Sequence, residues 1–132
     1  MGTMTDNAAQ PNGELVLRTL AMPADTNPAG DIFGGWLLSQ MDVAGGLAAK
    51  QRARGRVATV AIESMTFHRP VFVGDVLCCY AEILRVGRTS ITTRLEAWII
   101  RDDNYGERLR VTEGIFTYVA IDGDRQPRPV GG

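Results

Sequence analysis

Residues 33–49 read FGGWLLSQMDVAGGLAA, and this stretch decides the fold. It is apolar on every side of a helix, which is typical of a buried helix rather than a surface one. Its one charge is Asp42, and a buried carboxylate costs free energy unless it is paired, neutralised or used. An aspartate on the solvent face of an amphipathic helix is the alternative, but no polar stripe accompanies Asp42. The neighbours of Asp42 at helical spacing are mostly small: Gly35, Leu38, Gly45, Gly46 and Ala49. We therefore predict a central helix that begins near Phe33 and ends before Gly55, with Asp42 as a candidate functional residue.

The sequence around this helix is typical of long β-strands. Residues 90–100 alternate most clearly, with one face formed by Ile91, Thr93, Leu95, Ala97 and Ile99. We predict strands at 14–21, 56–67, 76–86, 90–100 and 107–121, with turns at 73–75, 87–89 and 102–106. One early helix followed by antiparallel strands indicates the α+β class. Because the strands are long, we expect the sheet to curve and wrap one face around the helix.

Length and composition favour one folded domain. The chain has 132 residues, 45% of them hydrophobic, so we predict a flexible segment at 1–13, a single domain at 14–122 and a flexible tail at 123–132. A formal net charge of -1 gives no global attraction for nucleic acid or an anionic membrane. The sequence shows neither a transmembrane run nor a signal peptide, so we expect a cytoplasmic location.

The two cysteines and the single histidine do not favour thiol or metal chemistry. Cys78 and Cys79 are adjacent, so on a strand their side chains point to opposite faces. This disfavours a disulfide and a shared metal site, and we interpret both as reduced core residues. A nucleophilic pair of a cysteine with His68 is the alternative, but nothing near the cysteines indicates an activated thiol. No metal-ligand spacing and no phosphate-binding P-loop occur.

Several motifs together resemble the hotdog-fold acyl-CoA thioesterases of the YciA type. The most specific block is Asn27-x-x-Gly30-Asp31-x-Phe33-Gly34-Gly35-Trp36, followed by Met41-Asp42. The other similar stretches are 18–23, 60–65, 73–76 and 86–90, so the resemblance extends from about Glu14 to Ile121. It implies a single hotdog domain, in which a curved antiparallel sheet wraps a long central helix. It also implies hydrolysis of acyl-CoA to coenzyme A and a free acid, without a cofactor or metal.

Thioester hydrolysis requires a base or nucleophile and a polarised carbonyl. Asp42 is our candidate for the first role, either by deprotonating water or by attacking the acyl carbon. Free amides at the helix start make the Gly35 N–H our candidate oxyanion donor. The alternative is that the Gly34-Gly35 pair only lets the tight loop enter the helix. The resemblance gives Asn27 a role in orienting water or the carbonyl, whereas an Asx-turn is the usual fate of such a residue.

Substrate-binding positions are also implied by the resemblance. Coenzyme A is expected along the turn formed by Arg88, Thr89 and Ser90, whose guanidinium and hydroxyls suit phosphates. The other expected substrate-binding residues are Gly34, Ser64 and Arg69. An exposed arginine in a turn is otherwise simply solvated. The resemblance further implies that two subunits build each site, so we expect a homodimer as the minimal unit and a hexamer of three dimers as the higher assembly.

Two other functions compete with thioester hydrolysis. A non-catalytic acyl-CoA-binding regulatory hotdog module would bind thioesters without cleaving them, but pure binding favours an apolar residue in place of Asp42. A hotdog dehydratase normally uses a histidine with a carboxylate, and His68 lies far from the helix in sequence.

Overall fold

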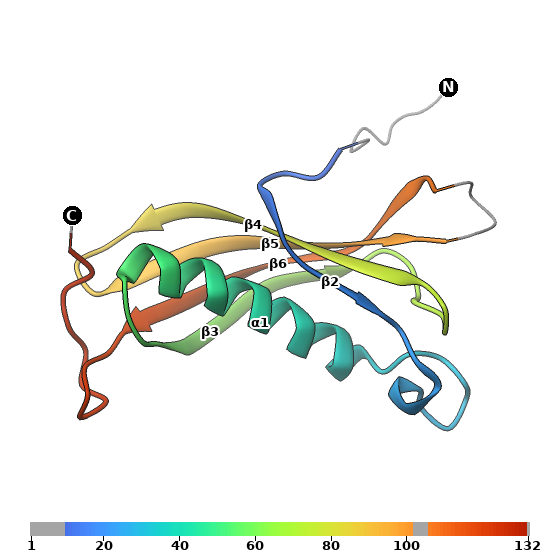
Figure 1. Ribbon diagram of the computed structural model, residues 1–132, viewed down its shortest axis with the longest axis horizontal. Helices are drawn as coiled ribbons and strands as arrows, with labels where there is room; N and C mark the ends of the chain where they lie inside the picture. Colours follow the sequence, from blue (N-terminus) through green and yellow to red (C-terminus); the bar gives the residue numbers. More distant parts are fainter. Residues whose placement is uncertain (1–9, 102–105, 132) are drawn as a thin grey trace.

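The computed structural model describes residues 10–101 and 106–131, and a long helix lies across one face of a curved antiparallel sheet (Figure 1). The helix α1 covers Gly34–Ala53, and a short 3-10 helix, η1 (Pro23–Asp25), precedes it. The strands are β2 (Glu14–Leu20), β3 (Val57–Phe67), β4 (Val76–Val86), β5 (Ser90–Ile100) and β6 (Arg108–Ala120). The predicted α+β class is confirmed, and each predicted element is present to within one residue at either end. Of the turn predicted at 102–106, only Gly106 lies within the described residues.

The sheet has the strand order β2-β4-β5-β6-β3, and every neighbouring pair is antiparallel. The face of β5 that we predicted to be apolar packs in the main core beneath α1, since Ile91, Leu95, Ala97 and Ile99 are all fully buried. The helix contributes Leu37, Met41, Ala44 and Ala49 to the same core. The spacing of these helix residues is three to five, which matches one helix face over a sheet.

The opposite side of α1 is open in the single chain. Val43 and Leu47 are 50% and 49% exposed. The edge strand β3 is similarly uncovered, with Val60 57% and Phe67 57% exposed. Exposed apolar side chains on a helix and on an edge strand are surfaces that a second subunit can cover.

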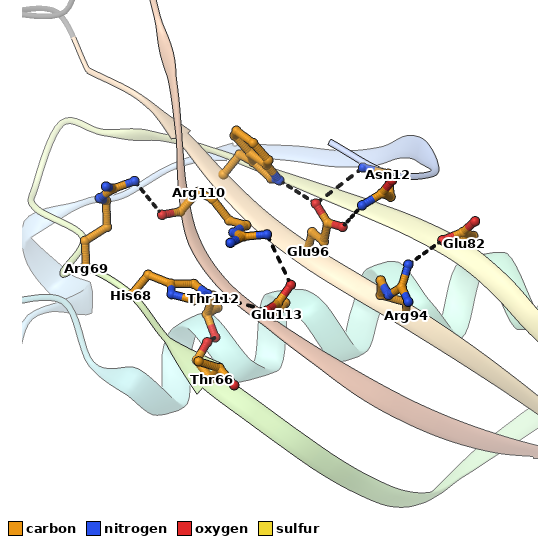
Figure 2. Close-up of polar contacts among 11 residues, drawn as sticks. Asn12, Thr66, His68, Arg69, Glu82, Arg94, Glu96, Arg110, Thr112 and Glu113 are labelled. Carbon is orange, nitrogen blue, oxygen red and sulfur yellow. Dashed lines mark hydrogen bonds and ion pairs between the residues drawn. The ribbon is translucent and has the colours of Figure 1, made fainter. Parts of the chain in front are cut away.

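The sheet face away from α1 carries a second, smaller core cluster of Cys78, Tyr80 and Trp98. Cys79 belongs to the main core instead, so the prediction that the two cysteines face opposite ways is confirmed. Glu96, which the alternation of residues 90–100 assigns to this face rather than to the main core, is only 1% exposed. Its carboxylate accepts hydrogen bonds from Trp98 Nε1 at 2.8 Å and from Asn12 Nδ2 at 2.8 Å, because the segment before β2 crosses over it (Figure 2).

The segment after residue 122, which we predicted to be flexible, returns to the domain. Arg128 N donates to Ala120 O, and Val130 N donates to Arg88 O at 2.8 Å. Val130 is 6% exposed, and Arg128 Nη2 caps the helix by donating to Ala53 O at 2.8 Å. Contacts with the domain therefore continue to Gly131, to whose carbonyl Arg52 donates. None of the described helices is long and apolar enough to cross a membrane.

Candidate active site around Asp42

Asp42 lies halfway along α1 on the flank that faces β3 and β6. Its side chain is half-buried, and Oδ1 accepts two hydrogen bonds from hydroxyls. Thr59 Oγ1 on β3 donates at 2.8 Å, and the Tyr118 hydroxyl on β6 donates at 2.9 Å. Thr59 and Tyr118 are direct cross-strand partners in the β3–β6 pair, so the sheet register brings both hydroxyls to one carboxylate oxygen. The carboxylate is paired with neutral donors rather than with a cation.

The second carboxylate oxygen, Oδ2, has no hydrogen-bond partner among the described residues. In the described chain every fully buried side-chain oxygen or nitrogen has a hydrogen-bond partner. Oδ2 has none, so it is not fully buried and is accessible. Asp42 thus has one anchored oxygen and one that is unpaired and not fully buried. A carboxylate in this arrangement can accept a proton from water or attack an electrophilic carbon.

The start of α1 offers free backbone donors. Phe33 occupies the N-cap position without a side-chain cap, and Leu37 N is the first amide that bonds back, to Phe33 O at 3.3 Å. Within the described ranges the amides of Gly34, Gly35 and Trp36 therefore have no acceptor. A side chain added at either glycine would meet nothing within 4 Å. The two glycines therefore leave the helix start uncrowded on their Cβ side, and the positive end of the helix dipole adds to the attraction of the free N–H groups for a developing oxyanion.

Asn27 holds together the loop that leads into α1. Its Oδ1 accepts hydrogen bonds from Ala29 N at 3.0 Å and Asp31 N at 3.1 Å, and its backbone N–H donates to Asp31 O at 2.7 Å. The Asx-turn that we named as the alternative is therefore present. The side-chain Nδ2 has no partner in the described part of the chain, so this amide keeps two protons to donate.

The predicted coenzyme A turn, residues 88–90, lies at the end of the sheet near the hydroxyl partners of Asp42. Ser90 pairs with Val119, the neighbour of Tyr118. The backbone of this turn is held by Gly87 N donating to Ser90 O and by Ala120 N donating to Thr89 O. The Arg88 side chain is exposed and makes no hydrogen bond or ion pair within the described residues.

Arg69 and Ser64 lie away from this end. Arg69 N donates to Val111 O, whereas Thr89 O accepts from Ala120 N. Val111 and Ala120 are nine positions apart on β6, which corresponds to about 30 Å along a strand. In one chain Arg69 and Arg88 therefore do not hold the same phosphate. The Arg69 guanidinium donates to Arg110 O at 2.8 Å (Figure 2).

Ser64 sits in a β-bulge of β3, between Glu63 and Thr66, and has a positive φ of 57°. With Thr66, Arg94 and Glu113 it lines a hollow of about 360 Å³ on the sheet face away from α1. His68 lies on this face too, 3.5 Å from Glu113 (Figure 2). The structure thus brings neither Ser64 nor His68 to Asp42 of the same chain.

A larger hollow, about 490 Å³, lies between the second half of α1 and strands β2 and β4, where Leu47, Ala48, Val16 and Ile83 line it. Asp42 lines neither hollow. No group of three or more His, Cys, Asp and Glu side chains among the described residues could hold a metal ion. Burial and, after it, the charge of Cys78 raise the pKa of Cys79 to about 12, which is the opposite of an activated nucleophile.

The two hydroxyl donors to Asp42 were missed in the sequence. Thr59 is one of many threonines in the strands, and Tyr118 is 76 residues from Asp42. One signal was present: Gly45, three positions after Asp42, leaves room under the helix for a group from the sheet.

Comparisons with known proteins show which family this chain resembles. The thioesterase superfamily model matches residues 29–104. The acyl-CoA thioester hydrolase YciA of Salmonella typhimurium is 57% identical over 130 residues, covering 97% of this chain and 96% of the relative. A hexameric thioesterase from Yersinia pestis superposes with a TM-score of 0.89 at 57% identity and covers 93% of this chain and 99% of that one.

A second solved relative is a hexameric broad specificity acyl-coenzyme A thioesterase, crystallised as a variant with an aspartate replaced by alanine. It is 52% identical, with a TM-score of 0.87, and covers 91% of this chain and 88% of that one.

Proposed function

This chain belongs to the hotdog-fold acyl-CoA thioesterases of the YciA type, and we propose that its thioester hydrolysis is carried out by Asp42 Oδ2. The chain is an acyl-CoA thioester hydrolase. The observation that supports the role of Asp42 is its asymmetric pairing: two hydroxyls hold Oδ1, and Oδ2 stays accessible. The relative crystallised with an aspartate replaced supports an aspartate at the centre of the reaction.

Hydrolysis from Oδ2 follows one of two routes. As a general base, Oδ2 takes a proton from water while the water oxygen bonds to the acyl carbon and the C=O electron pair moves to oxygen. Collapse of this intermediate breaks the C–S bond, and the thiolate of coenzyme A receives the proton. As a nucleophile, Oδ2 itself bonds to the acyl carbon and expels the thiolate, and water then cleaves the anhydride.

The oxyanion donor in either route is the Gly35 N–H, with Gly34 beside it, from the partner subunit. Gly35 and Asp42 of one helix are seven residues apart, which is about 10 Å along the axis. If one carbonyl group lies about 3 Å from each of two protein groups, those two protein groups are at most roughly 7 Å apart. Gly35 and Asp42 of the same helix are therefore too far apart to act on one carbonyl. If the helix of a second subunit lies antiparallel beside the first, the start of that second helix comes close to Asp42 of the first. The loop before the second helix then brings the free Nδ2 of its Asn27 to the same place.

The partner subunit covers the open surface of the single chain. Val60 and Phe67 on the edge strand β3 and Val43 and Leu47 on α1 are exposed apolar side chains that a partner can cover. Burying them in a two-fold interface places two active sites between the two helices. Because solved relatives are hexameric, we expect three such dimers in the full assembly. A cytoplasmic location also stays our prediction.

Coenzyme A is held by the Arg88-Thr89-Ser90 turn, where an uncommitted guanidinium lies near the Asp42 end of the sheet. Arg69 and Ser64 remain predictions for contacts with substrate. Within one chain, Arg69 and the Arg88-Thr89-Ser90 turn lie near opposite ends of β6. Arg69 and Arg88 would therefore contact the same substrate only if they came from different subunits of the dimer.

The direct test is release of free thiol from purified protein given short, medium and long acyl-CoAs. We expect turnover with at least one chain length, and loss of that turnover in Asp42→Asn. Tight acyl-CoA binding without thiol release from any substrate would overturn the enzyme assignment in favour of a regulatory binding module.

A further inference from the structure

Tyr118 reaches the carboxylate of Asp42 from inside the protein. Its side chain is 1% exposed, and its hydroxyl oxygen lies 2.9 Å from Asp42 Oδ1 and 3.1 Å from the Asp42 backbone oxygen. The hydroxyl has one proton, so it donates to one of these oxygens at a time. The same group thus contacts both the side chain and the backbone of the catalytic candidate.

Gly45 makes this contact possible. A Cβ at position 45 would overlap the Tyr118 hydroxyl oxygen and lie 2.7 Å from Leu95 Cδ1. Gly45 is fully part of the helix and has no turn or positive φ to explain it. A glycine inside a helix destabilises the helix relative to alanine, so the close approach of Tyr118 is the physical reason for its presence.

The Tyr118 hydroxyl is a donor at every working pH. Burial, and after it the hydrogen bond and negative charge of Asp42, raise the pKa of Tyr118 above its ordinary value. A phenol that keeps its proton donates to the carboxylate and cannot compete with it as a base. The hydroxyl therefore keeps the proton that it can donate to Oδ1, and Oδ2 is left as the reactive oxygen.

We propose that Tyr118, seated under Gly45, is a positioning residue that fixes the Asp42 carboxylate with Oδ2 toward the substrate. This inference rests on the proposed role of Asp42. Tyr118 touches no substrate itself, since it lies beneath the helix. The competing explanation is that Tyr118 only fills the core and Asp42 merely satisfies its buried hydroxyl.

The test is Tyr118→Phe, which keeps the ring and removes only the oxygen. Because hydrogen bonds to charged groups are among the stronger ones in proteins, we expect kcat to fall about 10-fold or more. KM for acyl-CoA should stay within about 2-fold, because no substrate contact is lost. Tyr80→Phe is the matched control: Tyr80 is also buried and hydrogen-bonded, to Arg108 at 2.9 Å on the other sheet face, and its variant should keep kcat.

A double-mutant cycle with Asp42→Ala separates positioning from packing. If Tyr118 acts through the carboxylate, Tyr118→Phe costs nothing further once the carboxylate is gone. An unchanged kcat in Tyr118→Phe, or an equal fractional loss in both backgrounds, would overturn the inference. Gly45→Ala is the second variant: it keeps the Tyr118 hydroxyl but displaces it from Asp42. This variant should have a lower kcat and an unchanged KM. A wild-type kcat in Gly45→Ala would also count against the inference.

The cycle distinguishes this inference from the proposed function. Near-wild-type kcat in Asp42→Ala would refute the role of Asp42 itself. Loss of activity in Asp42→Ala together with full activity in Tyr118→Phe would refute only the role of Tyr118.

Discussion

Thr59 donates its hydroxyl to Asp42 Oδ1 across 2.8 Å and thereby joins the edge strand β3 to the middle of α1. The bond lies on the open flank of the helix, where the proposed dimer forms. Any movement of β3 against α1 therefore moves the hydroxyl that anchors the carboxylate. This links the geometry of the reactive group to assembly.

The first prediction follows from that bond. Thr59→Val keeps the shape and removes the hydroxyl, so we expect kcat to fall about 10-fold, as for loss of a hydrogen bond to a charged group. Thr59→Ser keeps the hydroxyl and should retain most of the activity. Steady-state thiol release measures both variants, and equal activity of the valine and serine variants would show that the hydroxyl does not matter.

The second prediction concerns coenzyme A. Arg88→Ala should raise KM for acyl-CoA about 10-fold or more at low salt, because a charge-assisted hydrogen bond to phosphate is lost. KM for an acyl-pantetheine thioester, which lacks the nucleotide, should change little. Added salt should narrow the difference between wild type and variant, because the site is exposed. Equal KM changes for both substrates would mean that Arg88 supports the fold or the acyl pocket.

The third prediction is a pH dependence of stability that comes from Cys79. Its pKa rises from 9.0 to about 12 in the folded protein, chiefly through burial. Between these values the unfolded chain releases the thiol proton and the folded chain keeps it, so stability falls as pH rises. Urea unfolding from pH 8 to 10.5 should therefore show a smaller decline in Cys79→Ala than in wild type. Parallel curves for the two proteins would contradict a thiol that stays protonated when folded.

The helix and strands were predictable from the sequence because their signals are local. The alternation of 90–100 assigns Ile91 and Leu95 to the core, and both are fully buried. Long-range pairings were not readable in the same way. Thr59 and Tyr118 meet at Asp42 only because β3 and β6 pair in a particular register, which no local pattern contains.

Two local features of the structure explain why the positions of Ser64 and Glu96 could not be predicted from the sequence. The bulge at 63–66 places Ser64 at a positive φ on the face away from α1, and strict alternation does not show where a bulge falls. Glu96 is buried because Asn12 folds over it, a contact across 84 positions. Asn27 was predicted from the family resemblance, and Gly35 from the free amides of a helix start together with that resemblance; the single chain shows only that their free N–H groups are available.

The fourth prediction tests the shared site. Mixing an Asp42→Asn chain with an Asn27→Ala chain gives mixed dimers in which one site keeps both wild-type residues, if those residues come from different subunits. Thiol release should then recover toward half of the wild-type rate per mixed dimer. The homodimers of each variant are the controls. Absence of recovery after verified subunit exchange would place Asp42 and Asn27 of the site in the same chain.

The most direct measurement is the turnover number of Asp42→Asn, which keeps the side-chain shape and removes the reactive oxygen. The folded variant should bind acyl-CoA with nearly unchanged affinity, and kcat should fall by about 10²–10⁴-fold, as when a general base is lost. A variant that binds acyl-CoA and turns it over at close to the wild-type kcat would contradict the assignment of hydrolysis to Asp42.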